Sequence, residues 1–298
     1  MFVVLAPSVI GVMLLESALR PPRRAFGVTG VLPEEVGIRA ADGTALRAWY
    51  SPPARGSSGD AVIVLHGVGD NRLGVVSFAS LFRRHGYAVL TPDSRGHGES
   101  GGLVTYGLRE SDDVKRWAEW LEQRGARRLF GLGESMGAAI LLQSLEAGAP
   151  LCAVVAESPF STFREIAYDR MGQLFGLGTW FGRYPMRPVV EAALLYSRLR
   201  YGIALENVSP LDAVRATTAP VLLIHGPADR NIPVRHSRRI AAEKRAQVSL
   251  WEPSGAPHTR AYATHPAEFE KRVLALFGSC TDDTPRASGR IGAVPLAR

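Results

Sequence analysis

Short, continuous runs of apolar residues recur along the chain, and segments with helical periodicity lie between them. The run Ala61–Leu65 is typical of a strand that helices cover on both faces. The expected strands are 31–40, 46–50, 61–65, 87–91, 128–132, 153–156, 220–224 and 248–251, and the expected helices are 77–85 (with Ser77 as N-cap), 110–124, 138–147, 237–245 and 266–277. This alternation predicts an α/β fold with an open, mostly parallel sheet and helices on both faces. Ligands of such sheets bind at the carboxyl ends of the strands.

The segment Gly133-Glu134-Ser135-Met136-Gly137 lies between the expected strand 128–132 and the expected helix 138–147. G-x-S-x-G between a strand and a helix is the pattern of a nucleophile elbow. The sharp turn forces the central residue into a strained backbone, so the positions two residues before and after it must be small. Gly133 and Gly137 leave that room, and the pattern therefore predicts Ser135 as a nucleophile.

A serine hydroxyl needs a base that accepts its proton, and the base needs a carboxylate that orients it. Asp229 lies in the loop after the expected strand 220–224, and His258 lies in the loop after 248–251. The order Ser, Asp, His, each after its own strand, matches that of α/β-hydrolases. We predict His258 as the base and Asp229 as the acid.

Other residues compete for these roles. His265 is the alternative base, and Glu157, after the expected strand 153–156, is the alternative acid. We expect the remaining candidates to be structural: Asp212 as a helix cap, Asp93 as a residue that fixes the loop after it, and His225 as a packed residue at a strand end.

Taken together, these motifs resemble those of the α/β-hydrolases, within the serine-aminopeptidase-like and Bem46-like group. The resemblance extends from about Val36 to Phe277. It rests on the ordered occurrence of Asp42-Gly43, His66-Gly67-Val68-Gly69, Asp93-Ser94-Arg95-Gly96-His97-Gly98-Glu99-Ser100, the Ser135 elbow, the Asp229 turn and the His258 loop. A serine at the elbow argues against haloalkane dehalogenases and epoxide hydrolases, which have a carboxylate there. The resemblance to α/β-hydrolases implies that His66 and His97 shape the glycine loops in which they lie.

The resemblance implies an α/β-hydrolase fold with an eight-stranded, mostly parallel sheet, and it implies roles for five residues. Ser135 is the nucleophile, His258 the general base and Asp229 the orienting acid. The backbone N–H groups of Val68 and Met136 form the oxyanion hole, whose donors point to the charge that develops in the transition state. The expectation includes no cofactor and no metal, because the sequence shows neither metal-ligand spacing nor a phosphate-binding glycine loop.

Composition narrows the classes of partner. The chain has 298 residues and a net charge of +7, but its arginines are scattered rather than clustered. Nucleic-acid binding needs the basic charges on one face, so we expect no nucleic-acid partner. Two cysteines provide no disulfide framework, and we expect no bridge between Cys152 and Cys280.

The N-terminal segment 1–24 is expected to be separate from the catalytic domain 25–278. Residues 1–19 are mostly apolar and give about 28 Å of helix at about 1.5 Å per residue, enough for the core of a bilayer. We expect a membrane anchor, with the arginines that follow it holding the catalytic domain in the cytoplasm. A cleaved signal peptide and an amphipathic or buried helix are the alternatives, and without an anchor the protein is cytoplasmic or secreted.

An insertion of about 160–215 separates two expected strands and is rich in large apolar residues, including Met171, Leu174, Trp180 and Tyr184. We expect a short helical lid over the site. These side chains either form a small core of the lid or contact the substrate. The polar tail 279–298 has no periodicity and is expected to be disordered.

The expected activity is cleavage of carboxylic ester or thioester bonds through an acyl-enzyme, on a small-molecule or lipid-like acyl substrate. A serine peptidase or amidase of the same fold is the first alternative. An aminopeptidase needs carboxylates for the substrate ammonium, for which Glu157, Glu165 and Asp169 are candidates. A non-catalytic binding protein with a hydrolase fold is the alternative of another class.

Overall fold

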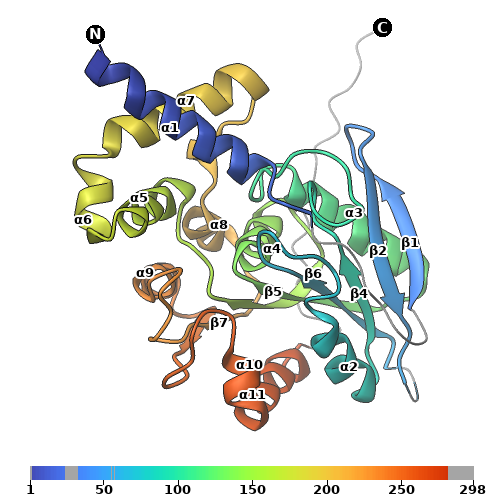
Figure 1. The fold of residues 1–298 in the computed structure, drawn as a ribbon. Helices are drawn as coiled ribbons and strands as arrows, with labels where there is room; N and C mark the ends of the chain where they lie inside the picture. Colours follow the sequence, from blue (N-terminus) through green and yellow to red (C-terminus); the bar gives the residue numbers. More distant parts are fainter. Residues whose placement is uncertain (1, 24–32, 55, 57, 281–298) are drawn as a thin grey trace, which may run out of the picture.

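The apolar runs form the middle of an eight-stranded sheet in the computed structural model, which describes residues 2–23, 33–54, 56 and 58–280, with residues 2–8 described by their backbone alone (Figure 1). The strand order is β1-β2-β4-β3-β5-β6-β7-β8. β1 and β2 are antiparallel to their neighbours, and all other pairs are parallel. The strands are β1 (Glu34–Arg39), β2 (Ala45–Ser51), β3 (Asp60–Leu65), β4 (Ala88–Pro92), β5 (Arg128–Glu134), β6 (Leu151–Glu157), β7 (Val221–Ile224) and β8 (Val248–Trp251). The predicted fold class is confirmed.

Side chains alternate between the two faces of each strand, and each face has its own hydrophobic core. On β3, Ala61, Ile63 and Leu65 join one core, whereas Val62 and Val64 join the other. The first core includes side chains of α3 (Glu110–Gln123), α4 (Met136–Glu146), α8 (Pro210–Ala216) and α9 (Arg235–Glu243), and the second includes those of α2 (Val76–Arg84), α10 (Ala261–Thr264) and α11 (Pro266–Gly278). Cys152 and Cys280 both lie buried in the second core as free cysteines, although Cys280 was expected in a polar tail.

The predicted elements recur in the structure with shifted ends. The start of the expected strand 31–40 and most of the tail 279–298 lie outside the described residues. The prediction that Ser77 caps a helix is wrong, because α2 begins one residue earlier and its N-cap, Val75, makes no side-chain capping bond. The short helix α10 was not predicted, because its four residues are too few to show a helical period.

The insertion between β6 and β7 consists of α5 (Phe163–Leu174), α6 (Gly178–Arg183), α7 (Arg187–Tyr201), the 3-10 turn η1 (Leu205–Asn207) and α8. In Figure 1, α5, α6 and α7 lie together at one side of the molecule, apart from the sheet. The large apolar residues of this insertion lie in two different environments. Met171 is buried, whereas Trp180 and Tyr184 are exposed.

The N-terminal helix α1 (Phe2–Leu19) lies against α7 (Figure 1). The two helices come so close that a Cβ atom on Gly11 would lie 2.8 Å from the Val189 carbonyl oxygen. The Glu16 carboxylate accepts hydrogen bonds from the hydroxyls of Tyr196, at 3.0 Å, and Tyr201, at 2.5 Å. Of the helices in the described part of the chain, none has the length and apolar character needed to cross a membrane.

Candidate active site

Ser135 lies at the sharp turn between β5 and α4. Its φ of 53° is in the left-handed region, which costs a non-glycine residue about 1–3 kcal/mol. A Cβ atom on Gly137 would lie 2.5 Å from the Leu65 carbonyl oxygen, and one on Gly133 would lie 2.5 Å from the backbone of Gly137. Only glycine fits at both positions, which confirms the steric argument for the elbow.

Asp229 and His258 are in direct contact. Asp229 follows β7, and its fully buried Oδ2 lies 2.7 Å from Nδ1 of His258 in the loop after β8. Its Oδ1 accepts hydrogen bonds from the backbone N–H groups of Asn231, at 2.8 Å, and Ile232, at 2.9 Å. Burial favours the neutral acid, but hydrogen bonds from His225 and His258 outweigh it and hold the pKa of Asp229 well below its usual range. The carboxylate is therefore ionised and oriented toward His258.

His225 has a role beyond the packing expected from the sequence. Its Nε2 lies 2.8 Å from the Ile232 carbonyl oxygen and 3.2 Å from Oδ2 of Asp229, and its Nδ1 lies 2.7 Å from the Ser237 hydroxyl. An Nε2–H therefore donates to the carbonyl, and Nδ1 accepts from Ser237. His225 fixes the loop that carries the acid. The sequence signal for this role was the position of His225 directly after β7, at the start of the loop that carries Asp229.

Ser135 and His258 make no side-chain hydrogen bond to each other within the described part of the chain. In structures without substrate this bond is often long and shortens in the complex. Two contacts of Glu157 hold the two loops near each other. Its backbone carbonyl accepts the Ser135 N–H at 2.8 Å, and its carboxylate accepts the Ala261 N–H at 2.8 Å, three residues after His258.

Glu157 and His265 were the alternatives to Asp229 and His258, and the structure places both away from these roles. Burial raises the pKa of Glu157 to about 7, and the described hydrogen bonds of its carboxylate include Ala261 but no imidazole. His265 is the N-cap residue of α11 and contacts Thr264. The prediction that Asp212 caps a helix is wrong, because Ser209 is the N-cap of α8 and Asp212 lies in the first turn, where it pairs with Arg215.

The expected oxyanion-hole residues flank Ser135. Val68 follows Gly67, where a Cβ atom would lie 3.4 Å from Cβ of Ser135. The Val68 N–H donates no hydrogen bond to any residue that the structure describes. Met136 is the first residue of α4, so its N–H has no carbonyl one turn earlier within the helix. In the part of the chain that the structure describes, neither amide has an acceptor, which is compatible with the expected role in an oxyanion hole.

His66 and His97 shape the loops beside the site, as expected. Ser94 N–H donates to Nε2 of His66 at 3.1 Å, and Gly69 N–H donates to Nε2 of His97 at 3.0 Å. Asp93 fixes the same loop through the backbone N–H groups of Arg72 and Glu99. The bond from Gly69 to His97 holds the backbone next to Val68.

The buried His97 makes stability depend on pH. Burial lowers its pKa from 6.5 to about 4, so below pH 6.5 the unfolded chain binds a proton that the folded protein does not. We expect this group to remove roughly 3 kcal/mol of the unfolding free energy as the pH falls from 6.5 to 4. Urea unfolding at pH 7 and pH 4.5 measures it. His97→Gln is expected to show a smaller loss than the unmodified protein, and equal losses would contradict the assignment.

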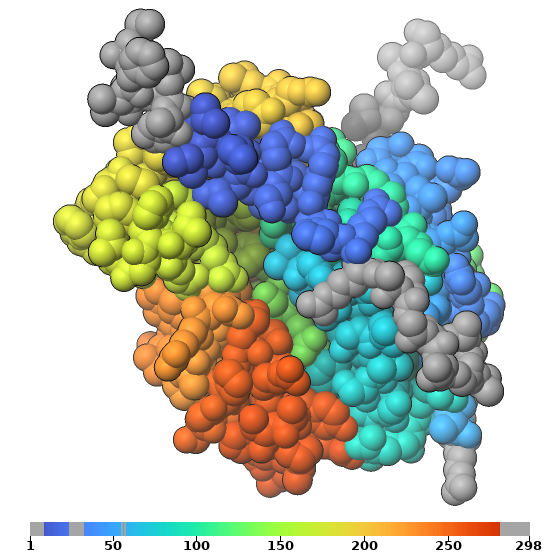
Figure 2. All heavy atoms as spheres, viewed as in Figure 1, coloured from blue at the N-terminus to red at the C-terminus, as the bar shows by residue number. Residues whose placement is uncertain are grey.

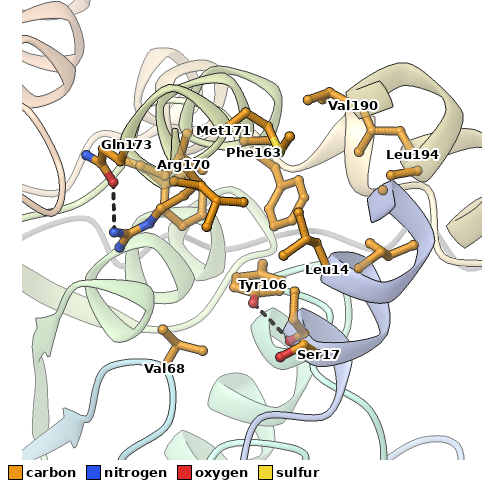
Figure 3. A pocket seen from close by; sticks show the side chains of 18 of the residues that line it. Leu14, Ser17, Val68, Tyr106, Phe163, Arg170, Met171, Gln173, Val190 and Leu194 are labelled. Atoms are coloured by element: carbon orange, nitrogen blue, oxygen red, sulfur yellow. Dashed lines mark hydrogen bonds between the residues drawn. The ribbon is translucent and has the colours of Figure 1, made fainter. Parts of the chain in front are cut away.

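A cavity of about 670 Å³ opens beside Ser135 (Figure 3). Its lining is mostly apolar and comes from the Val68 loop, Tyr106, the elbow, α5, α7 and α1. In Figure 2 the surface is hollowed where α1 (dark blue) meets the lid (yellow-green). Met171 and Leu174 of the lid line the cavity, as do Leu14 and Leu15 of α1. The N-terminal helix thus forms one wall of the cavity.

A second Ser–His–Asp cluster lies in the molecule and is fully buried. Nδ1 of His236 lies 2.9 Å from the Ser161 hydroxyl and accepts the Ser161 N–H at 3.0 Å, and its Nε2 lies 2.8 Å from Asp169. Ser161 has no exposed surface, so it cannot reach a substrate. The cluster connects α5 of the lid to α9. In the described ranges, no group of three or more His, Cys, Asp or Glu side chains is placed to hold a metal ion.

A strained serine between a parallel strand and a helix, with a carboxylate–histidine pair on two later loops, defines a protein of the α/β-hydrolase class. The chain belongs to the alpha/beta hydrolase family, whose model matches residues 62–272. The family resemblance seen in the motifs is confirmed.

Relatives and solved structures agree with this assignment. The chain is 33% identical over 233 residues to the uncharacterized protein YqkD of Bacillus subtilis (strain 168). The aligned region covers 76% of this chain and 73% of that protein. It is similar to the esterase Pf2001 of Pyrococcus furiosus, with a TM-score of 0.70 and 26% identity over 88% of this chain and 99% of that one. A proline iminopeptidase of Mycobacterium smegmatis shares the fold, with a TM-score of 0.58 and 17% identity over 82% of this chain and 98% of that one.

Proposed function

We propose that the protein is a serine hydrolase that cleaves carboxylic ester or thioester bonds through an acyl-enzyme intermediate. The observation that carries the proposal is the contact between buried Asp229 and His258, together with Ser135 at the wall of a mostly apolar cavity. The similarity to an esterase supports the same reaction class.

The reaction proceeds in two halves. Ser135 Oγ attacks the carbonyl carbon while Nε2 of His258 accepts its proton, and the amides of Val68 and Met136 bind the oxyanion. His258 then protonates the leaving alcohol or thiol. In the second half, His258 removes a proton from water, which attacks the acyl-enzyme, and His258 returns that proton to Ser135 Oγ as the acid is released. Asp229 stabilises the imidazolium in both halves and stays ionised.

The cavity favours a lipid-like acyl group. Leu14, Phe163, Val190 and Leu194 offer apolar contacts from three different helices. Burying a methylene group contributes about 0.8 kcal/mol, so affinity is expected to rise with chain length until the cavity is filled.

The aminopeptidase alternative lacks its carboxylates at the site. Glu157 bonds to Ala261, Glu165 pairs with Arg183, and Asp169 bonds to His236. None of the three is among the described residues that line the cavity. The lining residues that the structure describes therefore provide no carboxylate for a substrate ammonium group.

A fluorophosphonate probe tests the proposal, because it reacts with an activated serine. We expect labelling of the full chain at Ser135, located by peptide mass spectrometry, and none in Ser135→Ala. A panel of p-nitrophenyl esters and aminoacyl p-nitroanilides then separates esterase from peptidase activity, and we expect turnover of the esters. Absence of labelling would favour the non-catalytic alternative, and preferential cleavage of the anilides would favour a peptidase.

A further inference from the structure

Arg170 of α5 is the one charged residue among the described residues that line the cavity. The other lining side chains are apolar apart from a few hydroxyls and the amide of Gln173. In Figure 3, Arg170 and Gln173 lie at one end of the cavity, and Leu14, Val190 and Leu194 lie at the other. The cavity therefore has a cationic end and an apolar end.

Gln173 holds the Arg170 side chain in place. Nη1 of Arg170 donates to Oε1 of Gln173 at 3.0 Å, and Nε2 of Gln173 donates to the carbonyl oxygens of Arg230 and Asn231, both at 3.0 Å. These two carbonyls belong to the loop that carries Asp229. The amide thus fixes the guanidinium next to the acid loop of the catalytic site.

No carboxylate in the described part of the chain forms an ion pair with Arg170. Three other arginines that contact the lid differ in this respect: Arg164 pairs with Glu191, Arg183 with Glu165, and Arg235 with Asp169. Arg170 is instead exposed to the cavity. It offers several N–H donors that are not taken up by any acceptor among the residues that the structure describes.

An unpaired cation beside an apolar cavity affects which substrates bind. The protein around Arg170 removes part of its hydration, which lowers the pKa of the guanidinium, but the group remains a cation at neutral pH. An apolar substrate that filled the cavity would remove water from this cation without replacing its hydrogen bonds, which is unfavourable. A substrate anion replaces them with short, charge-assisted bonds.

We propose that Arg170 binds an anionic group, a carboxylate or a phosphate, on the alcohol or thiol part of the substrate. The acyl chain then lies toward the end of the cavity lined by α1 and α7. The substrates are single-chain acyl esters or thioesters with an anion close to the scissile bond. This inference rests on the proposed ester hydrolysis, because it orients the substrate relative to Ser135.

Matched substrate pairs test the inference on the full chain. The phosphate pair is 1-octanoyl-glycerol-3-phosphate and 1-octanoyl-glycerol, and the carboxylate pair is the octanoyl esters of glycolate and glycolamide. For each pair, the ratio of kcat/KM for the anionic ester to kcat/KM for the neutral ester is measured in the unmodified protein, Arg170→Gln, Arg170→Lys and Arg187→Gln. Arg187 is an exposed arginine of α7 outside the cavity lining.

We expect Arg170→Gln to lower the ratio about tenfold or more for at least one pair, as loss of a charged hydrogen bond predicts. Arg170→Lys should keep most of the ratio, and Arg187→Gln should keep all of it. The pair that responds identifies the anion as phosphate or carboxylate. Both esters of a pair are measured on the same protein, so partial unfolding of a variant cancels from the ratio.

Two results would overturn the inference, and they differ in what else they overturn. If the unmodified protein cleaves both members of each pair and Arg170→Gln leaves both ratios unchanged, Arg170 does not bind the substrate anion, and ester hydrolysis stands. If the unmodified protein cleaves no member of either pair and no p-nitrophenyl ester, the proposed function is wrong and this inference is wrong with it.

Discussion

Ser135→Ala is expected to lower kcat/KM for p-nitrophenyl esters on the order of 10⁴-fold or more, because the elbow 133–137 holds no other hydroxyl that could form the acyl-enzyme. We expect the residual rate to come from the proposed oxyanion donors at Val68 and Met136, whose backbone this substitution does not change. Stopped assays at several ester concentrations give kcat and KM separately. The loss is expected in kcat, because the cavity that binds the acyl chain is unchanged.

The folded state provides the control for this variant. Alanine keeps the Cβ atom of serine, so the backbone strain at φ 53° and the close contacts of Gly133 and Gly137 are the same in both proteins. The thermal unfolding midpoint should therefore stay within a few degrees of the unmodified value. A stable Ser135→Ala protein that kept its ester turnover would disprove the serine mechanism.

Asp229→Asn is expected to lower kcat roughly 10³- to 10⁴-fold. Oδ1 of Asp229 accepts two backbone N–H groups, from Asn231 and Ile232, so the amide oxygen of an asparagine would take that position. The amide NH2 group would then point at Nδ1 of His258 and favour the tautomer that cannot accept the proton of Ser135. The effect is measured by two quantities obtained with the same ester, the single-turnover rate constant and the steady-state kcat.

Asp212→Asn is the matched control, because the Asp212 side chain is more than half exposed and lies in the first turn of α8. It should leave kcat within about twofold, as surface substitutions usually do. The result that would contradict the assignment is an active Asp229→Asn together with an inactive Glu157→Gln. That pair of results would transfer the role of orienting acid to Glu157.

The sequence predicted the sheet and the elbow because their signals are local. An apolar run such as Ala61–Leu65 shows its two buried faces in five consecutive residues. The G-x-S-x-G pattern is equally short, and Gly133 is required by the backbone of Gly137 in the same turn, although Gly137 itself is required by the Leu65 carbonyl oxygen of β3. The positions of Asp229 and His258 follow from one rule, that the ends of parallel strands meet at one edge of a sheet. Local pattern and topology were enough for these features.

Contacts between distant segments could not be predicted in this way. The carboxylate of Glu157 bonds to Ala261, and His236 bonds to both Ser161 and Asp169, although no periodicity relates these positions. The sequence also shows no signal that α1 lies against α7 or that Arg170 faces the cavity. Both features depend on how the helices of the insertion between β6 and β7 are oriented, and patterns of apolar and polar residues in a single sequence do not specify that orientation.

The packing of α1 on α7 has a consequence for proteolysis. Gly11 lies against Val189, and Leu14 and Leu15 form a wall of the cavity, yet all residues of the elbow and of the acid and base loops lie more than 40 positions further along the chain. A protease that cut just after α1 would leave Ser135, Asp229 and His258 in one covalent piece, and the α1 wall of the cavity would then be held only by its non-covalent packing on α7. Loss of α1 after such a cut would change which substrates fit the cavity, but it would not change the residues proposed to carry out the reaction.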